Sequence, residues 1–224
     1  MPVRSLGNPK NSDNPRGRRE SADENWSSPL TNLHDDDRSR LRIGFRPYVY
    51  GKGVSMSVTT DFLAEFENEA KTTRRVLERV PTDKLGWKPH PKSMSLGGLA
   101  LHVASSPGVI CGWALDDVTE FGGGKPPDPA STEEIVAAHD KSVARVKEIL
   151  ASLSDEDVTK QWGAKPKGGG DVFTRMPKVA LLRSLGLNHT YHHRGQLSVY
   201  LRLLDVPVPS IYGPSADENP FARS

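Results

Sequence analysis

Apolar residues recur every three or four positions in four long stretches of the chain, which is the period of an amphipathic α-helix. The stretches cover 60–80, 95–115, 131–150 and 177–204, and the third opens with an S-x-x-E capping pattern. In the first, the apolar face consists of Phe62, Phe66, Ala70, Thr73, Val76, Leu77 and Val80. No stretch shows the sustained alternation of apolar and polar residues that is typical of a half-buried strand. The pattern therefore predicts an all-α bundle of four helices.

Segments rich in proline and glycine separate these stretches and indicate loops. They cover 81–94, 121–131 and 153–173, and a proline-rich extended tail covers 206–221. Glycines at 168–170 are consistent with a short hairpin inside the third loop. Pro107 and Gly108 interrupt the second helical pattern, and we expect a kink or a break there because proline lacks a backbone donor.

Residues 1–55 differ in composition from the rest of the chain. Scattered proline, glycine, polar and charged residues without an apolar period predict a disordered or non-native leader. This segment carries 10 Lys and Arg against 7 Asp and Glu, a net charge of +3. Residues 56–224 carry 20 against 21, a net charge of −1, and we expect them to form the globular domain with its tail. Because Met56 directly precedes the first helical pattern, we expect translation to begin there naturally.

Charge and composition exclude several functions. The near-neutral charge of 56–224 argues against a nucleic-acid partner. The longest apolar stretch, 96–115, is interrupted by histidine, serine and proline and is too broken to span a bilayer. The single cysteine, Cys111, rules out an internal disulfide and a multi-cysteine zinc site. We therefore expect a cytoplasmic protein without a membrane or nucleic-acid partner.

Three histidines are candidates for a divalent-metal site. His189 and His193 are four residues apart, so a helix points both imidazoles to one side. Leucines at the same spacing place this pair in a row that faces the core. A buried neutral imidazole needs a partner for each nitrogen, and a metal ion is one such partner; His102, in the middle of the second helix, is the candidate third ligand. An ordinary core histidine is the alternative, and spacing alone does not decide between them.

Neighbouring residues are less specific. His139 borders the apolar face of the third helix, where a packed or surface histidine is more common than a ligand. His192 points about 100° away from the residue that follows it and is expected to face a flank. We expect Arg194 to form a salt bridge at the edge of the bundle and Gly195 to admit a neighbouring helix.

Two strings in the sequence resemble those of the DinB/YfiT-like superfamily of metalloenzymes. They are L-x-x-H-V-A at 99–104 and N-H-x-x-H-H-R-G-Q-L at 188–197, and the resemblance extends over roughly 57–215. It implies a four-helix up-down-down-up bundle in which His102, His189 and His193 hold a divalent metal. The long leader departs from typical members, and the tail VPVPSIYGPSADE is similar to a branch often labelled damage-inducible.

Three imidazole ligands predict a catalytic type of site. They leave the full charge of the ion and an open coordination position, unlike a closed structural site. Zinc or nickel is favoured, with iron, cobalt, copper and manganese as alternatives, because imidazole suits all of them. Asn188, Gln196 and Tyr200 are close enough in sequence to hydrogen-bond the other ring nitrogens. No catalytic acid or base can be named.

The leading hypothesis is a metal-dependent transferase or hydrolase that acts on a small molecule. The resemblance points to a low-molecular-weight thiol as a partner, because some relatives transfer such thiols, and it also implies a homodimer. The alternative is a non-catalytic, metal-binding stress-response module in which the ion ties two helices together. A nucleic-acid role in DNA damage is suggested by the family label alone and is opposed by the charge of 56–224.

Overall fold

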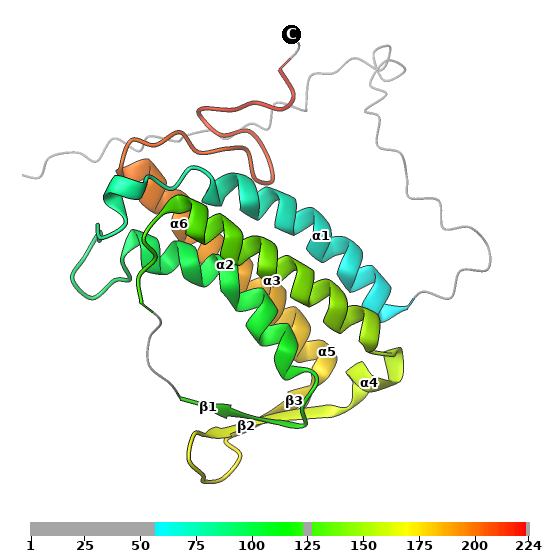
Figure 1. Ribbon diagram of the computed structural model, residues 1–224. Helices are drawn as coiled ribbons and strands as arrows, with labels where there is room; N and C mark the ends of the chain where they lie inside the picture. Colours follow the sequence, from blue (N-terminus) through cyan, green and yellow to red (C-terminus); the bar gives the residue numbers. More distant parts are fainter. Residues whose placement is uncertain (1–56, 123–126, 223–224) are drawn as a thin grey trace, which may run out of the picture. The chain divides into compact units, whose positions relative to one another are not determined.

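The computed structural model describes residues 57–122 and 127–222, and this part of the chain is mostly helical (Figure 1). Four long helical segments within it pack against one another. They are α1 (Val58–Leu77), α2 (Leu96–Trp113), α3 (Thr132–Ser152) and a fourth segment in which α5 (Lys178–Leu181), η3 (Leu182–Asn188) and α6 (His189–Leu203) follow without a break. Two short helices, η2 (Thr82–Lys84) and α4 (Asp155–Thr159), lie between them. None of the described helices is long and apolar enough to cross a membrane. The predicted leader, 1–55, lies outside the described residues.

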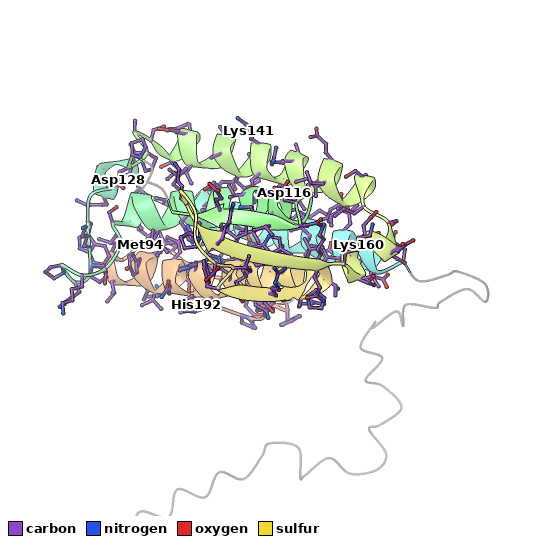
Figure 2. All side chains as sticks on the ribbon, turned by 90° about the horizontal axis from the view of Figure 1, so that it is seen from below. Met94, Asp116, Asp128, Lys141, Lys160 and His192 are labelled. Carbon is purple, nitrogen blue, oxygen red and sulfur yellow. The ribbon has the colours of Figure 1, made fainter. Side chains whose placement is uncertain are left out.

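A small sheet corrects the prediction of an all-α fold. β1 (Val118–Phe121) pairs in parallel with β2 (Gln161–Pro166), and β2 pairs antiparallel with β3 (Thr174–Pro177). The sheet lies below the helices in Figure 1, and in Figure 2 its strands cross between α3, which carries Lys141, and α6, which carries His192. Strands of four to six residues are too short for alternation to stand out from the surrounding loop sequence.

The hairpin expected around 168–170 joins β2 to β3. Gly168, Gly169 and Gly170 all have positive φ angles, between 86° and 117°, which glycine adopts without the steric penalty of a Cβ atom. The prediction of a hairpin is confirmed at this position, although the parallel partner strand β1 was missed.

Serine hydroxyls cap three of the long helices. Ser95 and Ser131 accept hydrogen bonds from backbone amides three residues later, as the capping patterns predict. Ser57 caps α1 from just before Val58, so the helix starts two residues earlier than the predicted stretch of 60–80. The Ser57 hydroxyl also donates to Asp155 Oδ1 at 2.9 Å, which ties the start of α1 to α4.

Helix α2 continues through Pro107, so the predicted break does not occur. The backbone N–H of Gly108 donates to Ser142 Oγ of α3 at 2.8 Å, and Gly108 O accepts from Arg145 Nε at 3.2 Å. Side chains of the neighbouring helix therefore bond the backbone next to the proline. A Cβ atom on Gly108 would lie 2.9 Å from that Ser142 oxygen, so glycine is required for this close approach.

A belt of buried polar residues separates two apolar clusters in the core. One cluster contains Phe62, Phe66, Ile110, Val146, Trp162 and Leu187, among others. The other contains Val76, Leu96, Leu99, Ile135, Leu197 and Leu201, among others. Each long helix contributes to the belt at the point where its side chains change from one cluster to the other; the members are Thr73, Ser106, His139, Ser142, Thr190 and Arg194.

Arg194 is the most heavily bonded member of this belt and is only 1% exposed. Its Nη2 atom lies 2.7 Å from Glu69 Oε2 and donates to the Tyr212 hydroxyl at 2.6 Å, and its Nη1 donates to Thr73 Oγ1 at 3.0 Å. The guanidinium also lies over the rings of Tyr191 and Tyr212, at 5.4 and 5.1 Å from their centroids. The expected salt bridge is confirmed, but it lies in the interior rather than at the edge.

The C-terminal tail packs on the side of the helices opposite the sheet (Figure 1). It forms no helix of its own after Leu204 within the described residues, as its prolines predict. Asp217 pairs with Arg202 of α6, and Glu218 pairs with Arg75 of α1. Tyr212 adds the bond to Arg194, so the tail is attached at three points.

We predict that Glu69→Gln lowers the free energy of unfolding by about 3 kcal/mol, because it leaves the buried Arg194 charge without a counter-ion. The measurement is urea denaturation followed by circular dichroism. Glu67→Gln is the matched control on the same helix, since Glu67 pairs with Lys147 on the surface and its loss should have no measurable effect. Equal destabilisation by both substitutions would contradict a special role for the buried pair.

Candidate metal centre

The three predicted histidines converge between α2 and α6. His189 Nε2 lies 3.3 Å from His102 Nε2 and 3.0 Å from His193 Nε2. One ring nitrogen of each residue lies within 4.8 Å of the other two, so this group could hold a metal ion. A tetrahedral ion with bonds of about 2.0–2.1 Å to nitrogen separates its ligand atoms by roughly 3.3 Å. The two separations from His189 Nε2 are close to this value.

The protonation of the ring nitrogens is also compatible with a bound cation. His193 Nδ1 lies 2.7 Å from Gln196 Oε1, which can only accept, so Nδ1 carries the proton and Nε2 of the neutral ring presents a lone pair. His189 Nε2 is in contact with two other ring nitrogens and has at most one proton to share between them. A cation that accepts a lone pair from each ring satisfies all three contacts at once. The donor set therefore fits a divalent metal.

The environment keeps the imidazoles neutral, as ligands must be. Burial, followed by the neighbouring imidazoles, lowers the pKa of His189 to about 4. Burial also lowers the pKa of His102, with a smaller contribution from His193. The pKa of His193 is lowered chiefly by burial, although its bond to Gln196 acts in the opposite direction. All three rings are therefore free of the competing proton at neutral pH.

The histidines lie at the border of the core rather than within it, which corrects the predicted core-facing row. The inward row of α6 is Thr190, Arg194, Leu197 and Leu201. The preceding segment η3 is a π-helix, whose i to i+5 bonds insert one residue relative to an α-helix and rotate the following residues by about 100°. The extrapolation from Leu182 and Leu185 assumed α-helical spacing, so it turned His189 and His193 too far inward.

A cleft of about 340 Å³ opens beside the histidines. It is lined by His102 and His189, by Ser105, Ser106, Val109, Ile110 and Trp113 of α2, by Phe121 of β1 and by Leu185 of η3. Two of the three imidazoles thus border a space that a small molecule could occupy. The site is not sealed by apolar side chains.

Other predicted residues lie away from the three imidazoles. His139 is 4% exposed on α3, with no hydrogen-bond partner for Nδ1 in the described part of the chain, and it lies outside the histidine group. Asn188 is exposed, and Tyr200 contacts the backbone of Met94 and the ring of Trp87, so of the three expected supporting residues only Gln196 bonds a ligand.

Two further expectations have different outcomes. His192 is exposed on the flank of α6, as expected (Figure 2). A Cβ atom on Gly195 would meet no atom within 4 Å, so the expectation that this glycine admits a neighbouring helix is wrong.

The helical pattern of the sequence indicated some of the residues that line the cleft. Ser106, Ile110 and Trp113 fall on the same predicted helical side as His102, which is where the structure places them. Phe121 and Leu185 carried no such signal. Phe121 reaches the cleft only because β1 pairs with β2, and Leu185 lies in the π-helical segment.

The fold and the site together define a mostly helical protein with a three-histidine group that could hold a metal. The chain belongs to the DinB family, whose sequence profile matches residues 56–220. It is 28% identical over 159 residues to an uncharacterized protein, YrdA, from Bacillus subtilis, which covers 70% of this chain and 89% of that protein.

Two solved structures share the fold. A DinB-like protein from Bacillus cereus matches with a TM-score of 0.55 and 26% identity, over 71% of this chain and all of that one. A DinB-like protein from Bacillus subtilis, YjoA, matches with a TM-score of 0.51 and 21% identity, over 66% of this chain and 96% of that one. The second likeness is a likeness of fold alone.

We predict that His189→Ala abolishes stoichiometric metal binding, because it removes the imidazole that contacts both others. The measurement is elemental analysis of the untagged, dialysed protein after incubation with zinc or nickel. His192→Ala is the matched control, since this histidine is exposed and lies outside the group. Equal metal content in the two variants would exclude the site.

We predict that Gln196→Leu weakens metal binding about 10- to 100-fold, since the bond that orients His193 and holds its proton on Nδ1 is lost. Competition with a chromogenic chelator measures the affinity. Asn188→Ala, at the start of the same helix, should leave the affinity unchanged. An unaltered affinity in Gln196→Leu would show that His193 needs no such support.

Proposed function

We propose that this protein is a metal-dependent enzyme that acts on a small molecule, with His102, His189 and His193 as the metal ligands. The observation that supports the proposal most is the cleft that borders His102 and His189. A structural ion that merely tied α2 to α6 would need no such opening. Zinc or nickel is the ion that we propose, and imidazole ligands are compatible with either.

The residues around the proposed metal site have different roles: some would bind the ion, and others orient a ligand or line the cleft. The bound ion would supply a positive charge that polarises a substrate atom or favours its deprotonated form. His193 is oriented by Gln196, and His102 and His189 face the cleft from opposite helices. The apolar side chains of the cleft exclude water from the reacting atoms, which strengthens electrostatic interactions there.

Transfer of a thiol is favoured over hydrolysis by the composition of the cleft. Among the described residues that line it, none is Asp, Glu, Lys, Tyr or Cys, and the imidazoles would be occupied by the ion, so the lining offers no side chain as a proton acceptor. A thiol, with a pKa of about 8.5, loses its proton far more readily than water at about 15.7. In the proposed transfer the thiol gives its proton to the solvent, its sulfur forms a bond to an electrophilic carbon, and the leaving group departs with the electron pair of the bond that breaks.

The finer features of the family resemblance belong to the same proposal. We infer an up-down-down-up order of the four helical segments, a homodimer and a cytoplasmic location. A non-catalytic metal-binding module in a stress response is the second candidate, and a three-histidine group between two helices is compatible with it as well.

We predict that the metal-loaded protein accelerates the reaction of a low-molecular-weight thiol with a chromogenic electrophile, and that filling the cleft by Val109→Trp lowers the rate at least tenfold without loss of metal. The screen pairs several thiols with 1-chloro-2,4-dinitrobenzene and includes p-nitrophenyl acetate as a hydrolytic substrate. Elemental analysis accompanies each rate measurement.

Val199→Trp is the control for the added bulk, because Val199 is exposed on α6 and lies outside the cleft. A metal-loaded protein that is inactive towards every pair would favour the module. Turnover of the ester alone would favour hydrolysis over transfer.

A further inference from the structure

The cleft beside the histidines has an unusual chemical composition for a site near a charged ion. No Lys, Arg, Asp or Glu is among the described residues that line it. We infer that the cleft takes a molecule whose body is uncharged and apolar or aromatic, and which presents one hydrogen-bonding group to Ser106 next to the three histidines. This inference deepens the proposed function and names the class of substrate.

The walls of the cleft suit an aromatic or aliphatic group. Trp113 and Phe121 meet at 4.6 Å between ring centroids with an angle of 58° between their planes, and Trp162 continues the aromatic group behind Trp113 at 6.0 Å. Val109, Ile110 and Leu185 complete the apolar lining. The volume of about 340 Å³ lies at the lower end of the range of about 300–1,000 Å³ for small-molecule pockets.

Two cations of neighbouring elements are already bonded elsewhere. Lys165 of β2 lies 3.1 Å from Glu120, the residue before Phe121. Arg145 of α3 donates to the backbone carbonyl of Gly108 at 3.2 Å. Away from the histidines, a carboxylate buried among the apolar side chains of the cleft would lose its hydration without gaining a cation, which is strongly unfavourable.

Ser106 is the polar exception in the cleft. The residue is 6% exposed, and its Oγ atom is buried without a hydrogen-bond partner in the described part of the chain. Ser105, which also lines the cleft, already donates to Leu101 O at 2.7 Å. Most buried hydroxyls are bonded, so an unbonded one that lines a cleft points to a partner supplied by a ligand. Ser106 lies one helical turn beyond His102, and this ligand group would therefore lie close to the metal site.

Hydroxamic acids test the inference, because they share one metal-binding group and differ in the attached body. Zinc-loaded full-length protein is titrated with acetohydroxamic, benzohydroxamic and 4-carboxybenzohydroxamic acid by calorimetry and by tryptophan fluorescence. We expect the benzo compound to bind about tenfold more tightly than the aceto compound, because its ring is buried, and the carboxylate to cancel this gain.

Variants inside and outside the cleft test whether the preference for the aromatic ring arises there. Val109→Asp adds a charge at a position that is 53% exposed, and it should remove the advantage of the ring without changing the affinity for acetohydroxamic acid. Val199→Asp, 56% exposed outside the cleft, should change neither affinity. Ser106→Ala should weaken all three compounds several-fold while leaving the urea midpoint of the free protein unchanged or raised, because it removes a hydroxyl that has no partner.

The outcomes separate this inference from the proposed function. Equal affinity for the aceto and benzo compounds, or a preference for the carboxylate, would overturn the inference while leaving the metal site intact. If no hydroxamate binds, the proposed metal-dependent function fails. Binding of benzyl alcohol and of benzoate to the metal-free protein, followed by NMR, then tests the inference about the cleft. Binding of the alcohol alone, sensitive to Val109→Asp, would sustain the inference, and binding of neither would overturn it.

Discussion

The buried guanidinium of Arg194 constrains the arrangement of the helices around it. A charge in the interior needs a counter-ion and several acceptors, and Glu69, Thr73 and Tyr212 provide them from α1 and the C-terminal tail. Helix α6 can make these bonds at one rotation about its axis, the one that points Arg194 at α1. His193, the preceding residue, then points about 100° away, towards α2 and His102. The buried ion pair thus positions the histidines indirectly, through the rotation of the helix that carries both.

The π-helical segment η3 determines which residues of α6 face the core. It lies between α5, whose Leu181 is fully buried in one apolar cluster, and α6, whose Leu197 and Leu201 belong to the other. The extra residue lets both ends of the fourth segment face the core while His189 stays at its border. A histidine in the centre of the core would be sealed off from any substrate, whereas one at the border meets both the neighbouring helix and the cleft. Irregular helical turns of this kind frequently occur at functional sites.

Local periodicity predicted the four helical segments, whereas the convergence of the three histidines was implied by the resemblance to the DinB/YfiT-like superfamily. The sequence did not predict what depends on contacts between distant segments. β1 exists because residues 118–121 pair with 163–166, and neither stretch has enough residues for a pattern of its own. Pro107 was expected to kink or break α2, but the helix continues, and the Ser142 hydroxyl that bonds the next amide comes from another helix. Arg194 was placed at an edge because a charged residue is usually exposed, and its partner Glu69 lies 125 positions earlier.

On α6, the residues that stabilise the fold and the histidines of the candidate metal site are adjacent in sequence but lie on different faces of the helix. Thr190 and Arg194 face the interior and hold the helix in place, whereas His189 and His193 face α2 and the cleft and contribute little to the apolar clusters. The polar belt of the core makes this division possible, because it brings α1, α2, α3 and α6 together at one level without filling that level with large apolar side chains. Ser106 lies where this belt meets the cleft, and its hydroxyl has no hydrogen-bond partner within the described part of the chain. A group that stabilises nothing in the free protein is free to serve a ligand, and for this reason the cleft, rather than the core beneath it, is where binding specificity can change without loss of the fold.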